Sequence, residues 1–380
     1  MDKNRLKIVY CTPALYMTGG VERVLALKAN YFAEHFGYDI TIILTEGKGK
    51  SFAYPLSDKI KVVNLDINFE ELWTCSFLKK IFVYLKKQRI YKRKLTAELM
   101  RIRPDITDSL LRREINFLTK IKDGSKKIGE LHVNRSNYRN FEGKDANFLK
   151  NVFANLWMRN LIGHLRSLDK FIVLTEEDKS AWTELDNVVA IPNPISFTTK
   201  SVSPLTEKRV LAVGRYVYQK GFDLLLKAWA VVERAIPDWH LDVYGQGDRS
   251  PFLELSKELR LQRCNLNGST TEIQKEYMNS SLFVISSRFE GLSMAFLEAM
   301  SFGLPVVSFA CPCGPRDVIT DGVNGILVPK EDVAKLADAI INVIQSPEYA
   351  KELGKNASKR AMDFQIDVLA ERWKHLFENL

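Results

Sequence analysis

The stretch of residues 281–305 constrains the fold more than any other part of the chain. It reads SLFVISSRFEGLSMAFLEAMSFGLP, and its apolar run 282–285 has the length of a buried strand. A helix is expected after the polar turn, with Ser293 as its N-cap, Gly303 at its end and Pro305 preventing its continuation. This helix is apolar almost all round, so the stretch must lie inside a domain.

Two carboxylates make the same stretch a candidate binding site. Glu298 lies in the middle of the apolar helix, where a carboxylate without a donor is costly, so it should accept hydrogen bonds. Glu290 precedes the helix, and Gly291 beside it would let the backbone approach a ligand. With the N–H groups of the helix N-terminus, these acids suit an anionic, hydroxylated ligand such as a nucleotide sugar. The alternative is an ordinary buried helix in which a structural Arg or Lys satisfies Glu298.

Length and composition predict a globular protein of two domains. The 380 residues exceed one typical core, and 46% of them are hydrophobic. The net charge of +9 favours an anionic partner: a phosphorylated substrate, an acidic membrane surface or nucleic acid. Five scattered cysteines without zinc-ligand spacing indicate reduced thiols. The first residues lack a signal-peptide pattern and no apolar run approaches about 18 residues, so we expect a cytoplasmic protein without a membrane span.

Strands and helices alternate along both halves of the chain. In the first half, strands are expected at 6–10, 39–44 and 61–65, with a helix from about Val21. This alternation predicts a parallel, doubly wound sheet. Gly19 and Gly20 would then follow the first strand at the edge where such sheets bind ligands.

A second alternation begins after residues 192–208, which are rich in Pro, Ser and Thr and are typical of a linker. Gly214, Arg215 and Lys220 follow the strand expected at 209–213. The spacing is not that of a Walker loop, but the two cations lie where they could hold a diphosphate. Gly245 follows the strand expected at 240–244.

Residues 79–103 form the most basic segment of the chain. They contain ten Lys or Arg and one acid, Glu98, with apolar residues interleaved at roughly helical spacing. A basic amphipathic helix of this kind predicts binding to anionic lipid or another polyanion. A solvated helix that happens to be basic fits equally well. Nucleic acid is not expected as a partner, because no recognisable binding motif accompanies the charge.

His132 lies at the end of a strand expected at 127–133. A lone histidine in such a place is more often packed than catalytic. Position alone therefore gives it little weight.

In combination these motifs resemble glycosyltransferase family 4, which has the GT-B architecture. The residues that carry the resemblance are Gly19-Gly20-Val21-Glu22, Gly214-Arg215 with Lys220-Gly221, Glu290 and Glu298 with seven residues between them, and the segment 321–329. They occur in the family's order over nearly the whole chain. The resemblance implies two Rossmann-like domains facing a central cleft, with the acceptor domain at 1–192, the nucleotide-sugar donor domain at 193–363, and the helix 364–380 packing back on the first.

The resemblance also implies roles for individual residues. Arg215 and Lys220 would hold the donor diphosphate and stabilise the leaving nucleotide. Glu298 would bind the ribose and Glu290 the donor sugar, with backbone N–H groups near the sugar–phosphate junction. His132 is the best match to the family's donor-facing histidine, although its flanking sequence departs from the usual pattern. The donor site as a whole would comprise Gly19, Gly20, Gly214, Gly245, Gly291, Leu292, Ser293, Met294 and Glu298.

The resulting hypothesis is a retaining glycosyltransferase that needs no metal and no further cofactor. It would move a hexose or N-acetylhexosamine from a nucleotide sugar, with UDP favoured and GDP an option, to a lipid-linked or surface glycan. Residues 79–103 would then dock on the inner face of the cytoplasmic membrane. Two alternatives stay open: a nucleotide-sugar 2-epimerase of the same architecture, and a non-catalytic protein that binds sugar or polyanion. The motifs leave the donor, the acceptor, the linkage and the oligomeric state open.

Overall fold

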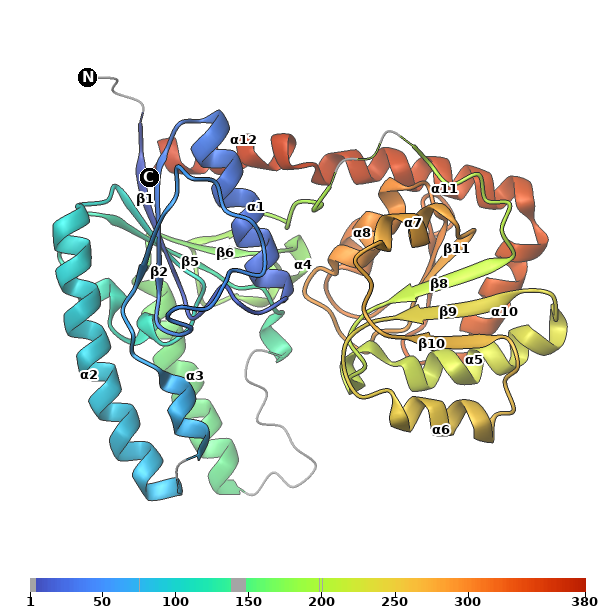
Figure 1. Cartoon of the computed structure of the whole chain (residues 1–380), viewed down its shortest axis with the longest axis horizontal. Coiled ribbons are helices and arrows are strands. Elements are labelled where there is room, and N and C mark those ends of the chain that lie inside the picture. The colour runs from blue at the N-terminus through green and yellow to red at the C-terminus, as the bar shows by residue number, and fades with distance from the viewer. Residues whose placement is uncertain (1–4, 75, 138–147, 198, 200) are drawn as a thin grey trace. The chain divides into compact units, whose positions relative to one another are not determined.

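The computed structural model describes residues 5–74, 76–137, 148–197, 199 and 201–380 (Figure 1). The chain forms two compact units: unit 1 contains Met1–Pro192 and Ile366–Leu380, and unit 2 contains Asn193–Gln365. Each unit is built on one parallel sheet. The predicted fold class, α/β with two Rossmann-like doubly wound sheets, is confirmed. Cys75 lies outside the described residues.

The sheet of unit 1 has seven strands in the order β3-β2-β1-β4-β5-β6-β7, all parallel. Its strands are β1 (Lys7–Thr12), β2 (Asp39–Leu44), β3 (Lys61–Asn64), β4 (Ile106–Ser109), β5 (Lys126–Glu130), β6 (Lys170–Val173) and β7 (Val188–Ala190). The strand expected at 127–133 is wrong at its end. After the backbone N–H of Leu131 bonds to Ile172, the chain leaves the ladder, so His132 lies in the following loop.

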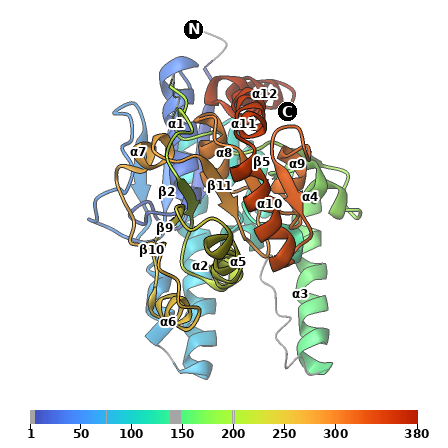
Figure 2. The ribbon, with the colours of Figure 1, turned by 90° about the vertical axis from the view of Figure 1, so that its right-hand side faces the viewer.

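Helices cover both faces of this sheet (Figures 1 and 2). Alternate residues of β1 point to opposite faces, so Ile8 and Tyr10 pack with α1 and α12, and Val9 and Cys11 pack with α2. Trp373 and Phe377 bring α12 into the first of these cores. The helices of unit 1 are α1 (Gly20–His35), α2 (Phe77–Ile102), α3 (Phe148–Arg166), α4 (Glu176–Ala181) and α12 (Ile366–Glu378).

The sheet of unit 2 has six parallel strands in the order β10-β9-β8-β11-β12-β13. They are β8 (Arg209–Val213), β9 (His240–Tyr244), β10 (Cys264–Asn267), β11 (Leu282–Ile285), β12 (Val306–Phe309) and β13 (Ile326–Val328). The chain first builds outward from β8 to β10, and then crosses back to place β11 on the other side of β8. This reversal makes the carboxyl ends of β8 and β11 a topological switch point, where sheets of this type bind ligands.

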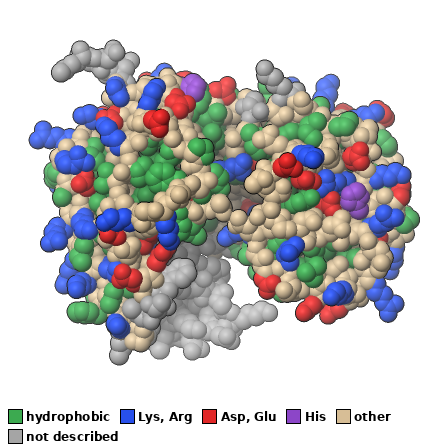
Figure 3. All heavy atoms as spheres, in the orientation of Figure 1, with side chains coloured by type: hydrophobic (Ala, Val, Ile, Leu, Met, Phe, Trp, Pro, Cys, Tyr) green, Lys and Arg blue, Asp and Glu red, His purple; other side chains and the backbone are tan. Residues whose placement is uncertain are grey.

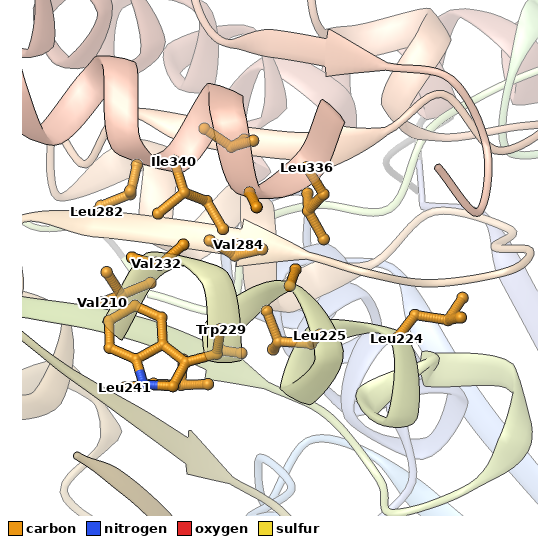
Figure 4. Close-up of a cluster of buried hydrophobic side chains, with 14 of the residues drawn as sticks. Val210, Leu224, Leu225, Trp229, Val232, Leu241, Leu282, Val284, Leu336 and Ile340 are labelled. Carbon is orange, nitrogen blue, oxygen red and sulfur yellow. The ribbon is translucent and has the colours of Figure 1, made fainter. Parts of the chain in front are cut away.

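The helices of unit 2 also lie on both faces of their sheet. They are α5 (Phe222–Ala235), α6 (Ser250–Glu258), α7 (Ile273–Met278), α8 (Met294–Ser301), α9 (Pro315–Val318), α10 (Val333–Gln345) and α11 (Pro347–Ala361). Trp229 of α5 is fully buried and packs beside Leu336 and Ile340 of α10 in one core (Figure 4). The sequence analysis did not assign α6, α7 or α11.

Helix α8 begins and ends where the sequence predicts, but the side chain of its N-cap residue does not make the expected hydrogen bond. Gly303 follows the helix with φ +71°, the left-handed conformation that stops helices. Ser293 occupies the N-cap position with extended backbone, yet its side chain makes no capping hydrogen bond. The expected side-chain cap is therefore wrong. Because Ser293 does not cap this end, the first-turn N–H groups are not satisfied by that hydroxyl.

Candidate active site

Two loops at the switch point of unit 2 are bound tightly to each other. The first leads from β8 through a short 3₁₀ turn, Tyr218–Lys220, and the second follows β11. Arg288 of the second loop donates to the carbonyl of Tyr218 (2.8 Å) and forms a bidentate pair with Asp223 (2.8 and 2.6 Å). The hydrogen bonds to Asp223 raise the pKa of the Arg288 guanidinium. The backbone N–H of Arg288 also donates to Gln219 (2.8 Å), so the two loops form one rigid platform.

This platform brings Lys220 and Glu290 together. The Lys220 Nζ lies 2.6 Å from the Glu290 Oε1, which also accepts a hydrogen bond from the Ser287 hydroxyl at 2.6 Å. The side chain of Lys220 is 14% exposed and that of Glu290 is 5% exposed. Such a pair is stronger than a surface ion pair because little water screens it. An ammonium and a carboxylate thus lie at the carboxyl ends of β8 and β11.

A small cavity lies beside this pair. Its polar lining consists of Lys220, Ser286, Ser287, Glu290 and Ser293. Ser293 lies at the N-terminus of α8, where helix N–H groups favour negative charge. The cavity therefore joins one ammonium group, one carboxylate, three hydroxyls and the N-terminus of a helix.

Glycines allow the loops of unit 2 to come this close. Gly221 has φ +62°, and a Cβ there would lie 2.0 Å from the carbonyl oxygen of Ser286. A Cβ on Gly245 would lie 1.7 Å from the carbonyl oxygen of Gly214. A Cβ on Gly314, which has φ +88°, would lie 3.2 Å from the carbonyl oxygen of Gly291. The loops that carry Gly214, Gly245 and Gly291 therefore lie in backbone contact with a neighbour.

Glu298 is buried in the middle of α8, as the sequence predicts. Its side chain accepts a hydrogen bond from Ser196 and another from the Tyr277 hydroxyl (3.0 Å). The residue is 2% exposed. Among the described residues, two hydroxyl groups therefore donate to this carboxylate.

Arg215 differs from Lys220 in its surroundings. Its side chain is exposed, and the structure gives it no ion pair with any residue that it describes. An exposed guanidinium at the end of β8 can take up an anion without first breaking an internal salt bridge.

The predicted residues of unit 1 fall in two places. Gly19 is the N-cap of α1, and the Glu22 carboxylate folds back against it. Gly20 opens the helix, and a Cβ there would meet nothing within 4 Å. The side chain of His132 is 7% exposed, and its Nε2 lies 3.4 Å from the Glu130 Oε2.

Several residues that position the predicted site residues were not predicted from the sequence. Ser287 and Arg288 position Glu290 and the turn before Lys220, and Ser196 and Tyr277 hold Glu298. The pair Ser286-Ser287 directly after an apolar strand was an available signal. The contact between Ser196 and Glu298 spans 102 residues, so no local pattern announces it.

The described part of the chain contains no group of three or more His, Cys, Asp or Glu arranged to hold a metal ion. Within the same residues, no helix combines the length and the apolar character that crossing a membrane requires.

Comparison with known proteins shows which families and structures this chain is similar to. Residues 196–360 match the family model described as "Glycosyl transferases group 1". An "Uncharacterized glycosyltransferase" of Haemophilus influenzae is 28% identical over 94% of this chain and 95% of its own. A Campylobacter jejuni protein named as an N-acetyl-D-galactosaminyltransferase acting on a PP-undecaprenol-linked glycan is 25% identical, over 94% of this chain and 95% of its own.

A solved structure supports the fold over the whole chain. Crystals of a mutant of S. aureus TarM in complex with Fondaparinux, alpha-GlcNAc-glycerol and UDP give a TM-score of 0.74 at 18% identity, covering 98% of this chain and 99% of TarM. The match to the group 1 glycosyl transferases therefore falls on unit 2, and the chain as a whole has the GT-B fold. The comparisons therefore support sugar transfer. They give no support to the 2-epimerase or binding-protein alternatives.

Proposed function

We propose that this enzyme transfers a hexose or N-acetylhexosamine from a nucleotide sugar with retention of configuration and without a metal ion. The observation that carries the proposal is the pairing of Lys220 with Glu290 and Ser287 beside the N-terminus of α8. A diphosphate needs positive charge in the transition state as the nucleotide leaves. Lys220, Arg215 and the N-terminus of α8 would supply that charge without a metal ion.

The remaining residues would then divide the donor between them. Glu290 would accept hydrogen bonds from hydroxyls of the sugar, exchanging its contact with Ser287 or Lys220 for one with the substrate. Glu298 would accept from the ribose diol in place of Ser196 or Tyr277. Gly291, Leu292 and Met294 would present backbone N–H groups at the sugar–phosphate junction, and His132 would contribute from unit 1.

UDP is the favoured nucleotide, because the TarM structure of similar fold was solved in complex with UDP. The favoured acceptor is a lipid-linked or surface glycan. The name of the C. jejuni relative gives an acceptor on PP-undecaprenol, and that relative matches this chain along nearly its whole length.

A donor panel tests the enzymatic part of the proposal. UDP-, GDP- and ADP-sugars are offered with candidate lipid-linked acceptors, nucleotide release is measured, and products are identified by mass spectrometry. Lys220→Ala and Glu298→Ala should each abolish transfer, whereas Lys257→Ala, on the exposed surface of α6, should not change it. Near wild-type transfer by both variants would show that the site is wrong. An isomerised donor formed without any acceptor would instead establish the epimerase.

We further propose that α2 docks unit 1 on an anionic membrane at the cytoplasmic face. Phe82 and Leu85 are 72% and 53% exposed near the start of α2. Lys86, Arg89 and Arg93 are also exposed, and their spacing places them on the same face as Phe82. Lys and Arg side chains line the side of unit 1 where α2 lies (Figure 3). An exposed apolar pair beside a row of cations fits a membrane surface better than a solvated helix.

Not all the basic residues of α2 are available to a membrane. Lys87 donates to the carbonyls of Ile67 (2.6 Å) and Asn68 (2.8 Å), and Lys94 donates to that of Leu65 (2.5 Å). A test must therefore spare both of these lysines. The triple charge reversal of Lys86, Arg89 and Arg93 should reduce flotation with anionic vesicles, and reversal of Lys257, Lys275 and Lys355 in unit 2 should not. Absence of wild-type flotation at low salt would overturn the membrane proposal.

A further inference from the structure

A cluster of polar groups lies inside the core of unit 1, on the sheet face that α1 and α12 cover. Tyr10 of β1 and Asp108 of β4 are direct neighbours in the ladder. Glu130, the last residue of β5, lies one pleat further along on the same face as Asp108. Lys28 reaches the cluster from α1. Asp108, Lys28 and Glu130 are 0%, 2% and 3% exposed, so water does not screen their charges.

Lys28 and Glu130 form a buried ion pair. The Lys28 ammonium also lies 3.9 Å from the ring centroid of Trp373 and 5.1 Å from that of Tyr10. Two aromatic faces and one carboxylate therefore surround the ammonium group. This fixes the position of the Glu130 Oε1 and leaves its second oxygen, Oε2, directed at other partners.

Asp108 has a different electrostatic state from Glu130. Neither of its carboxyl oxygens accepts a hydrogen bond from a residue that the structure describes. Burial, together with the nearby negative charge of Glu130, raises the pKa of Asp108 well above its ordinary value. Burial alone would raise the pKa of Glu130 as well, but Lys28 and His132 hold it below its ordinary value. Of the two neighbouring carboxyls, Asp108 is therefore the one on which protonation is favoured, and the charges of Lys28 and Glu130 balance.

His132 completes the cluster. Its Nε2 lies 3.4 Å from the Glu130 Oε2, and neither ring nitrogen makes a hydrogen bond to the described residues. A small rotation of the ring would align an N–H on Nε2 with that oxygen. The other nitrogen, Nδ1, would then carry a lone pair.

We propose that Glu130 is a positioning residue for His132. Held in place by its ion pair with Lys28, Glu130 selects the tautomer of His132 that has hydrogen on Nε2 and an acceptor at Nδ1. The inference rests on the proposed function in one respect only: the acceptor nitrogen would receive a hydrogen bond from a hydroxyl of the donor sugar. The cluster holds Glu130 as a fixed anion inside a core, which an exposed carboxylate could not match.

Nitrogen-15 NMR of histidine-labelled full-length protein tests the tautomer directly. The chain has five histidines, and His132→Gln identifies the signals of interest. In the wild type, His132 should show hydrogen on Nε2. Glu130→Gln should shift it towards the other tautomer or a mixture, because an amide can donate to Nε2 as well as accept from it. The double variant Lys28→Met, Glu130→Gln avoids a buried unpaired ammonium and should show the same shift.

Asp108→Asn is the matched control. An amide N–H takes the place of the proton that is favoured on Asp108, so the tautomer should stay as in the wild type. Hydrogen on Nδ1 in the wild type, or an unchanged tautomer in the double variant, would overturn the inference.

Transfer assays separate this inference from the proposed function. The double variant should lose about 10-fold to 100-fold in kcat with little change in KM, as when outer partners of a functional histidine are removed. If the tautomer behaves as proposed but His132→Gln transfers sugar normally, the role of His132 in the reaction fails and the positioning by Glu130 stands.

Discussion

Gly245→Ala should push the loop after β9 away from the loop after β8, which carries Arg215 and Lys220. A Cβ at this position would lie 1.7 Å from the Gly214 carbonyl oxygen and 2.8 Å from its carbon. Carbon and oxygen in contact need about 3.3 Å, so the loops must separate by about 1.6 Å. Two backbone hydrogen bonds cross the same gap, Gly214 to Tyr244 (3.0 Å) and Tyr216 to Gln246 (2.7 Å). The obstacle is backbone on both sides, so a side-chain rotation cannot relieve it.

This displacement should both weaken donor binding and destabilise the fold. Overpacking of this kind costs about 1–3 kcal/mol of stability. Arg215 directly follows Gly214, and a charged hydrogen bond lost by misplacement is worth about 1.5–3 kcal/mol. The Kd for UDP should therefore rise about 10-fold to 150-fold.

Isothermal titration with UDP and a thermal melt measure the two effects separately. Gly268→Ala is the matched control, since Gly268 follows β10 as Gly245 follows β9 and a Cβ there would meet nothing within 4 Å. The control should bind UDP like the wild type. If Gly245→Ala also does so, the close approach of the two loops does not position the cations and the reasoning is refuted.

Three further predictions concern other parts of the molecule. Lys87→Met should destabilise unit 1 by about 1–3 kcal/mol, because the carbonyls of Ile67 and Asn68 lose their donor. In a thermal melt, the control Lys86→Met should stay within about 0.5 kcal/mol of the wild type. Equal destabilisation by the two variants would contradict the structural role of Lys87. A hydrogen bond from Arg135 lowers the pKa of Glu184 from 4.5 to about 2, so this pair stabilises the fold above pH 4.5 and the contribution is lost as the pH falls through about 2. The Tm deficit of Glu184→Gln should accordingly be largest near neutral pH and shrink in acid, and a pH-independent deficit would refute the linkage. Burial raises the pKa of the Cys264 thiol to about 12, so mass spectrometry should find it unalkylated by iodoacetamide at pH 8 until the protein is unfolded, and rapid labelling of the native protein would contradict this.

Sequence patterns predicted the strands of both sheets well, because parallel strands buried on both faces are short apolar runs. β2, β8, β9 and β11 have the predicted bounds. Helices α6, α7 and α11 were not assigned. α11 is more polar than the others, and tertiary packing through its few buried residues, such as Leu353, holds it in place.

The candidate site was predictable mainly where its residues are close in sequence to a strand end. Glu290 and Lys220 are of this kind, whereas Glu298 was predictable as the one carboxylate in an apolar helix. The Lys28–Glu130 pair joins positions 102 residues apart, and so does the Ser196–Glu298 bond. The raised pKa of Asp108 was equally inaccessible, because it depends on the burial of this residue and on the charge of Glu130. These properties arise from packing, which a single sequence does not report.

Unit 1 is assembled from two separate segments of the chain, and this determines which unit can be completed first. Unit 2 is one continuous segment, Asn193–Gln365, whereas unit 1 takes its last helix from Ile366–Leu380. During synthesis the first 192 residues leave the ribosome without Trp373 and Phe377, so the ammonium of Lys28 lacks one of its covering rings. Unit 2 has all its parts earlier than unit 1, although it is made second. Although domains generally fold in N-to-C order, unit 1 is begun first and is the last to be completed, because its core takes side chains from both Met1–Pro192 and Ile366–Leu380.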